Sequence, residues 1–84
     1  MIGWLKRLAL IGLLSHATLG SAATLLDGIR AYDAGRHGAA FEIFEDLALN
    51  GNPRAQAWTG YLYERGEGVV ANLQEAARWY MEGA

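Results

Sequence analysis

AFEIFEDLA, at positions 40–48, returns 36 residues further along the chain as AARWYMEGA, at positions 76–84. The two copies keep small, aromatic and acidic residues in register, and their apolar residues have the three-and-four spacing of a helix. A period of this length is typical of proteins built from stacked helical repeats, in which each unit buries its apolar face against its neighbour. The repeat therefore predicts an all-α fold.

Four helices are expected, and helix start signals support the last two. Asn52 is placed to cap the third helix, whose first residue is Pro53, and Asn72 with Glu75 forms a capping-box pattern before the fourth. The second connection between paired helices is expected to be five residues longer than the first, an insertion that helical hairpins tolerate. The expected helices cover residues 24–34, 39–50, 53–65 and 73–82.

Residues 1–23 are predicted to be a secretory signal peptide. Lys6 and Arg7 form a basic head, residues 8–14 are an apolar run, and residues 20–23 are the small residues that a leader peptidase requires. An uncleaved inner-membrane anchor is the alternative, because residues 8–26 carry no charged side chain over about the length of a bilayer span. The expected localisation is periplasmic or secreted, or inner-membrane anchored under the alternative.

The remaining residues, 24–84, are expected to form one small acidic domain, with a degenerate first unit at 24–51 and a second unit at 52–84. Without the signal peptide, five arginines stand against nine aspartates and glutamates, a net charge of −4. Because no basic tract remains to neutralise phosphates, we expect no nucleic-acid partner and no membrane contact beyond the leader. The chain has no cysteine, so packing and not disulfides must stabilise the domain.

A more specific pattern runs through residues 55–84. In order, it comprises Ala55-Gln56, Gly60, Tyr63, Gly66-Glu67-Gly68-Val69, Asn72 and Glu75-Ala76-Ala77-Arg78-Trp79-Tyr80. This series resembles the Sel1-like repeat, a relative of the tetratricopeptide repeat with a longer loop, and residues 24–51 look like a degenerate preceding unit. The resemblance implies an α/α superhelix of two stacked helical hairpins that acts as a protein–protein interaction adaptor, often in the bacterial envelope.

Small residues are expected at the seam between paired helices. Gly60 and Ala76 are small enough to let two helices approach closely. Thr59 and Gly83 depart from the repeat pattern and are expected to loosen the second unit, since a glycine lowers helix stability by about 0.5–1 kcal/mol relative to alanine. The aromatic residues expected to supply buried area are Tyr63, Trp79 and Tyr80.

The third predicted helix carries the candidate partner-binding residues. Arg54, Trp58, Tyr61 and Arg65 lie on one face, at i, i+4, i+7 and i+11. In superhelical repeats the first helix of each hairpin lines the concave surface, and Trp, Tyr and Arg are frequent binding hot spots. We therefore expect a protein or peptide partner, with the two aromatic residues as anchors and the two arginines paired with its carboxylates or carbonyls. The alternative is that Trp58 only covers the first hairpin.

No catalytic residue, metal site or cofactor is expected, so the protein is not predicted to be an enzyme. His37 is the only histidine outside the signal peptide, and it lies in a predicted turn without a nucleophile beside it. The acidic groups at 42–46 and 64–67 lack the spacing of a calcium loop and are interpreted as solvated faces.

A self-associating structural module is the second functional hypothesis. Residues 73–84 have no following hairpin to pack against, so Trp79, Tyr80 and Met81 are expected to be uncovered and able to pair with a second copy. A homo-oligomer is thus an alternative to a separate partner. A third interpretation is that the chain is a shortened fragment of a longer Sel1-repeat protein.

Overall fold

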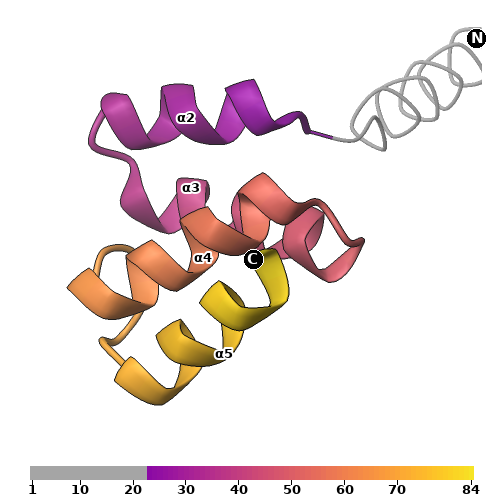
Figure 1. Cartoon of the computed structure of the whole chain (residues 1–84). Helices are drawn as coiled ribbons and strands as arrows, with labels where there is room; N and C mark the ends of the chain where they lie inside the picture. Colours follow the sequence, from indigo (N-terminus) through magenta and orange to yellow (C-terminus); the bar gives the residue numbers. More distant parts are fainter. Residues whose placement is uncertain (1–22) are drawn as a thin grey trace, which may run out of the picture.

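A computed structural model describes residues 23–84, which are all-helical, with four α-helices and no strand in this range (Figure 1). The helices are α2 (Leu25–Asp33), α3 (His37–Leu49), α4 (Pro53–Arg65) and α5 (Leu73–Gly83). The predicted all-α class is therefore confirmed. None of these helices has the length and apolar character of a membrane span. The predicted signal peptide, apart from Ala23, and most of the alternative membrane anchor lie outside the described residues.

Local side-chain caps explain where α2 and α4 begin. The Thr24 hydroxyl accepts a hydrogen bond from the Asp27 N–H at 3.2 Å, and the Asp27 carboxylate accepts one from the Thr24 N–H at 2.9 Å, which completes a capping box. The same hydrogen bonds lower the pKa of Asp27. At α4, Asn52 Oδ1 accepts from the Ala55 N–H at 3.0 Å, as predicted, and Pro53 takes the first helical position.

The predicted capping box of α5 forms only in part. Asn72 Oδ1 accepts from the Glu75 N–H at 3.0 Å. The Asn72 N–H, however, donates to the Tyr63 carbonyl at 2.9 Å, and the Glu75 carboxylate pairs with Arg78 at 2.6 Å. The Asn72 N–H is therefore bonded to α4 and is not available to the Glu75 carboxylate, as a complete capping box requires.

Helix α3 begins at His37, two residues before the predicted start. Gly35 adopts a φ of 79°, which glycine tolerates best, and the Arg36 N–H donates to the Ala31 carbonyl at 2.9 Å. The chain therefore reverses within residues 34–36 and is helical again at position 37.

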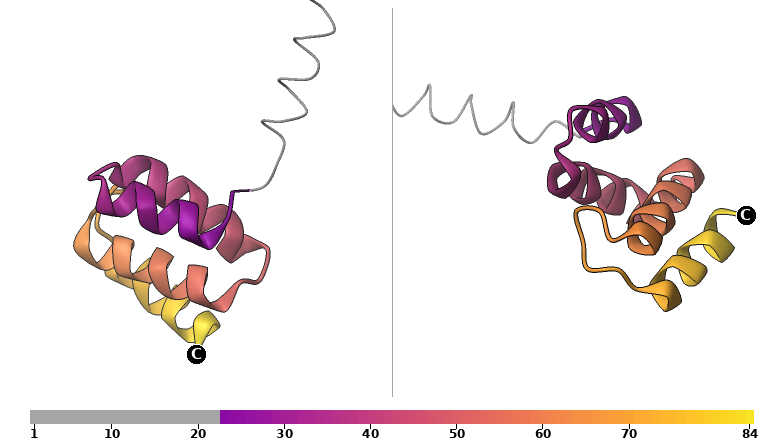
Figure 2. Two further views of the ribbon diagram at one scale, coloured as in Figure 1. Left: turned by 90° about the horizontal axis from the view of Figure 1, so that it is seen from above. Right: turned by 90° about the vertical axis from the view of Figure 1, so that its left-hand side faces the viewer.

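Each helix packs on the next one along the chain, and Figure 2 shows α4 between α2 and α5. The main core lies between the first helix pair (α2 and α3) and α4, where Phe44 and Leu62 are fully buried beside Ala40 and Phe41. A smaller cluster joins α3, α4 and α5. Its buried residues are Ala48, Ala55 and Trp79.

A glycine brings the two helices of each pair together at equivalent positions. A Cβ added to Gly28 of α2 would stand 2.6 Å from the Phe44 ring of α3, and one added to Gly60 of α4 would stand 2.9 Å from the Tyr80 ring of α5. Phe44 and Tyr80 lie 36 residues apart, at the same place in the repeat. The predicted role of Gly60 as a close-approach residue is confirmed.

This equivalence corrects the predicted loop insertion. Three residues, 34–36, connect α2 to α3, and seven residues, 66–72, connect α4 to α5. The insertion is therefore four residues and not five. The prediction was wrong because it aligned Tyr32 with Tyr63, whereas the matching glycine contacts align Gly28 with Gly60 and hence Tyr32 with Glu64.

The two departures expected to loosen the second helix pair (α4 and α5) are accommodated. Thr59 is fully buried, and its hydroxyl donates to the Ala55 carbonyl at 2.7 Å, so this hydroxyl is not left without a partner. At Gly83, an added Cβ would stand 3.0 Å from the Pro53 carbonyl oxygen. Glycine there lets the end of α5 approach the start of α4.

The aromatic residues of α5 separate into two environments. Trp79 is only 5% exposed and packs into the cluster formed by α3, α4 and α5, so the prediction that it lies in the core is confirmed. The other prediction, that Trp79 is uncovered at the end of the domain, is wrong. Tyr80 is 38% exposed and Met81 is 75% exposed, so both are exposed, as expected of an uncovered end. The other prediction for Tyr80, that it supplies buried area, is wrong, because Gly60 of α4 packs against only one side of its ring. Tyr63 is half-buried, with its ring centroid 5.2 Å from that of Phe41.

Candidate binding groove

An open groove of about 370 Å³ follows one face of α4. Ala57, Trp58 and Tyr61 of α4 form its floor, Tyr32 of α2 forms one wall and Tyr80 of α5 forms the other. We call these five residues the aromatic groove. Four of the five are aromatic and they come from three helices, so the groove exists only when both helix pairs are folded and in contact.

Ring-to-ring contacts fix the floor of the aromatic groove. The Trp58 indole stacks on Phe44 with centroids 4.7 Å apart and planes within 7°. Its other neighbours are Tyr32, at 5.2 Å between centroids, and Tyr61, at 5.9 Å with the rings nearly perpendicular. Trp58 therefore covers the core of the first helix pair and lines the groove at the same time. Because the core holds it in one orientation, little side-chain freedom remains to be lost on binding.

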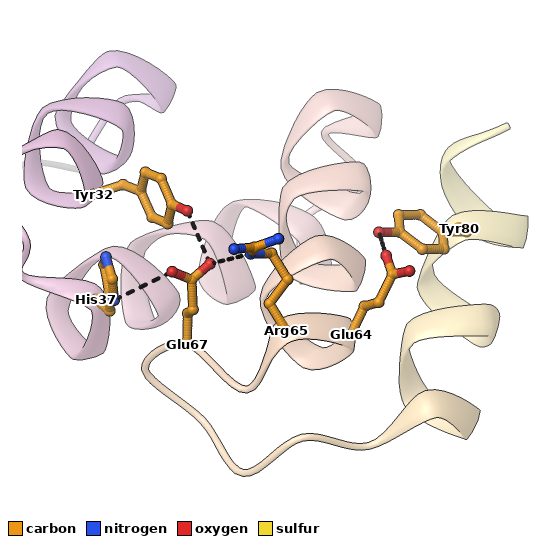
Figure 3. Close-up of polar contacts among 6 residues, drawn as sticks. All are labelled: Tyr32, His37, Glu64, Arg65, Glu67 and Tyr80. Carbon is orange, nitrogen blue, oxygen red and sulfur yellow. Dashed lines mark hydrogen bonds and ion pairs between the residues drawn. The ribbon is translucent and has the colours of Figure 1, made fainter.

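Glu67 gathers polar contacts at one end of the aromatic groove (Figure 3). Its Oε1 accepts hydrogen bonds from the Tyr32 hydroxyl at 2.8 Å and from Arg65 Nε at 2.9 Å, and its Oε2 lies 3.7 Å from His37 Nδ1. The bond from Tyr32 is the main cause that lowers the pKa of Glu67, and Arg65 adds to it. The same bond raises the pKa of Tyr32. Since Glu67 belongs to the loop after α4, it connects that loop to α2 and α3.

His37 takes part in this arrangement and does not lie in a turn, contrary to the sequence prediction. It is the first residue of α3, and its ring stacks on Tyr32 with centroids 4.7 Å apart and planes within 23°. The prediction failed because the ring contact joins the end of α2 to the start of α3 across a turn that is tighter than expected.

A second carboxylate, Glu64, holds the opposite wall. Its Oε1 accepts a hydrogen bond from the Tyr80 hydroxyl at 2.7 Å (Figure 3). Burial, with this hydrogen bond, raises the pKa of Tyr80 to about 12. The ion pairs within residues 23–84 involve Glu67 and Glu75 but not Glu64, so its negative charge is not offset by a cation in this part of the chain.

The four predicted partner-binding residues have different places in the structure. Trp58 and Tyr61 lie together in the aromatic groove. Arg65 lies beside it, with its guanidinium 5.3 Å from the centre of the Tyr61 ring and its Nε bonded to Glu67. Arg54 is exposed on the first turn of α4, one turn before Ala57 and Trp58 on the same face.

Sequence reasoning missed both walls of the groove, Tyr32 and Tyr80, and the carboxylates that hold them. The exposure of Tyr80 could have been inferred from the repeat. Its equivalent, Phe44, is covered by Trp58 of the next helix, and no described residue covers Tyr80 in the same way. The contact between Tyr32 and Glu67, 35 residues apart, has no comparable signal.

Within residues 23–84 no group of three or more potential metal ligands is present. Comparison of the chain with protein-family models, with curated proteins and with solved structures finds no match, and its function is therefore inferred from the groove itself.

Proposed function

We propose that this protein is a non-catalytic adaptor that binds a protein or peptide in the aromatic groove. The observation that carries the proposal is the convergence of four aromatic side chains from three helices on one open groove. Tyrosine and tryptophan offer large apolar surfaces at a low cost in side-chain entropy, and they are enriched at binding hot spots. The stacking on Phe44 and the hydrogen bonds to Glu64 and Glu67 hold three of the rings in place before any partner arrives.

The fold proposed for this role is an α/α superhelix of the Sel1-like or tetratricopeptide type. Two features support it: the glycine–aromatic contact occurs at equivalent places in both helix pairs, and the second pair has the longer loop. In such an arrangement α2 and α4 are the first helices of consecutive hairpins and would line the concave side. With the predicted signal peptide, the adaptor would act in the periplasm or as a secreted protein.

Selection from a random peptide library displayed on phage tests the proposal. The immobilised protein should enrich peptides that bind it, and Tyr61→Ala should abolish their capture because it removes part of the groove floor. Leu49→Ala is the matched control, since Leu49 is an apolar α3 residue that is 70% exposed outside the groove. If wild type and Tyr61→Ala captured the peptides equally and had the same helicity, the aromatic groove would not be the binding site. A library that yields no binder would contradict peptide binding.

Self-association through α5 is the second candidate, and one observation favours it. Leu73 is 65% exposed and Met81 is 75% exposed on the same helix, which leaves an apolar surface in water. The exposed residues of α2 include Asp27 and Arg30 beside one leucine, Leu26, so a second copy would pair α5 with α5 more readily than α5 with α2. A following unit in a longer repeat protein would cover the same surface.

Sedimentation equilibrium separates this candidate from the first. Under self-association, the protein sediments as a dimer, and the double variant Leu73→Lys, Met81→Lys sediments as a monomer. A monomeric wild type at high micromolar concentration would exclude the candidate.

A further inference from the structure

Negative charge collects at one end of the aromatic groove. Glu64 and Glu67 accept hydrogen bonds from the hydroxyls of Tyr80 and Tyr32, the two walls. Glu64 lies in the last turn of α4, and Glu67 lies just after the end of that helix. Arg65 offsets one of the two carboxylates through its contact with Glu67. The exposed carbonyls at the carboxyl end of a helix add further negative potential. This end of the groove is therefore acidic on balance.

The other end of the groove carries positive charge. Arg54 is exposed in the first turn of α4, where the helix dipole is also positive, and no carboxylate of residues 23–84 lies within ion-pair distance of it. Glu64 lies ten positions after Arg54, which corresponds to about 15 Å along a helix. An extended peptide covers that length with about five residues, at roughly 3.3 Å each.

The rings between these ends are able to accept a cation. The Arg65 guanidinium already lies over the Tyr61 ring at 5.3 Å, within the range of a cation–π interaction. A lysine or arginine side chain of a ligand has apolar methylenes that would pack on such rings while its charge reaches the carboxylates. The acidic balance of the residues after the signal peptide, −4, favours the approach of a basic ligand.

We propose that the aromatic groove selects a short extended peptide by the direction of its charge, with a basic side chain at Glu64, apolar residues over Trp58 and Tyr61, and an acidic group at Arg54. This inference rests on the proposed function and specifies its ligand. The apolar rings supply most of the contact area, whereas the two charged ends determine which peptides fit and in which direction they lie.

Three pentapeptides, N-acetylated and C-amidated, test the inference with the purified protein. The first is Lys-Leu-Pro-Leu-Glu, the second replaces its lysine by norleucine, and the third replaces its glutamate by glutamine. We expect each replacement to weaken binding by about three- to tenfold at low salt, and we expect the differences to shrink as ionic strength rises. Titration followed by tryptophan fluorescence gives the affinities.

Charge-removing variants of the protein assign each effect to one end. Glu64→Gln keeps an oxygen acceptor for the Tyr80 hydroxyl, and with this variant the lysine and norleucine peptides should bind equally. Arg54→Gln should remove the preference for the glutamate peptide. Glu42→Gln and Arg36→Gln are the matched controls, since both residues are exposed on or beside α3, outside the groove lining, and should leave every preference intact.

The outcomes distinguish the two levels of the proposal. If all three peptides bind wild type equally and Tyr61→Ala abolishes all binding, the charge inference is wrong and the proposed function stands. If no peptide binds at millimolar concentration, both are wrong. A nitroxide label at the lysine end should broaden the resonances of residues around Glu64. Broadening around Arg54 instead would reverse the assigned direction and overturn the inference.

Discussion

Phe44 and Tyr80 occupy the same place in the two helix pairs, yet Phe44 is fully buried and Tyr80 is 38% exposed. Each ring lies against a glycine of its partner helix, Gly28 or Gly60. The difference comes from the other side of the ring. Trp58 of the next helix stacks on Phe44, whereas Tyr80 lines the open aromatic groove.

The comparison teaches that equivalent positions of the two helix pairs are core in the first pair and groove wall in the second. The residue types agree with this division. Phenylalanine has no polar atom and suits a site without water, whereas the hydroxyl of tyrosine reaches Glu64 at the rim. Among residues 23–84, the groove therefore lies on the side of the ring that is left uncovered.

Alanine substitution at the two positions should give the largest contrast in stability. Phe44→Ala removes a fully buried ring and should cost about 3–5 kcal/mol, which is close to the whole stability of a domain of this size. Tyr80→Ala removes a half-covered ring and should cost about half as much or less. Urea unfolding followed by circular dichroism measures both. Equal losses would mean that the two rings do not differ in burial in solution.

Adding a methyl group at the two glycines sharpens the same comparison. Gly28→Ala pushes against a Phe44 ring that Trp58 holds in place, so it should destabilise the protein by about 1–3 kcal/mol. Gly60→Ala pushes against a Tyr80 ring that lines the open groove and on which no ring of residues 23–84 stacks. Its cost should therefore be smaller than that of Gly28→Ala, although the Ala76 carbonyl oxygen at 3.1 Å prevents it from vanishing. Thermal unfolding of the two variants gives the order, and the reverse order would contradict the account.

Alanine substitutions at Trp58 and Tyr61 should have different effects on stability but the same effect on peptide binding. Trp58→Ala uncovers Phe44, so the protein should lose both peptide binding and a few kcal/mol of stability. Tyr61→Ala leaves that stacking in place and should lose binding with the smaller effect on the urea midpoint. If Tyr61→Ala were the less stable of the two, Tyr61 would belong to the core and not to the groove.

The contacts of Glu67 predict the smallest effect, a dependence of stability on pH. Folding lowers the pKa of Glu67 from its ordinary value of 4.5. The contribution of Glu67 to the free energy of unfolding is therefore complete above about pH 4.5, and it is lost as the pH falls through the lower pKa of the folded state. Glu67→Gln should lower the melting temperature by a few degrees at pH 7, and the gap to wild type should close toward pH 3. Glu42→Gln, with an exposed carboxylate, serves as control. A gap that stays constant from pH 7 to pH 3 would show that Glu67 makes no such contacts in solution.

The existence of the helices could be predicted because their signals are local. The cap at Asn52, Pro53 at the next position and the glycines that follow α2, α3 and α4 depend on residues within one turn of each other. The start of α3 was misplaced because it depends on how tightly residues 34–36 turn, which only the packing of α2 on α3 determines.

The candidate site could be predicted only in its centre. Trp58 and Tyr61 follow from the spacing on one helix, whereas Tyr32, Tyr80 and their carboxylates come from other helices and from the loop after α4. Arg65 contacts Glu67 and Tyr61 in the folded chain, and its expected pairing with a partner stays a prediction. Whether a side chain contacts its own chain or a partner depends on distances in the folded structure, and no pattern along the sequence reveals it.

Chemical-shift mapping by NMR tests the central claim most directly, namely that the uncovered ring of the second helix pair forms the wall of a peptide-binding groove. On titration with Lys-Leu-Pro-Leu-Glu, the account predicts that the largest shifts fall on Tyr32, Trp58, Tyr61 and Tyr80. Shifts confined to Leu73 and Met81, with the four aromatic residues unchanged, would contradict it.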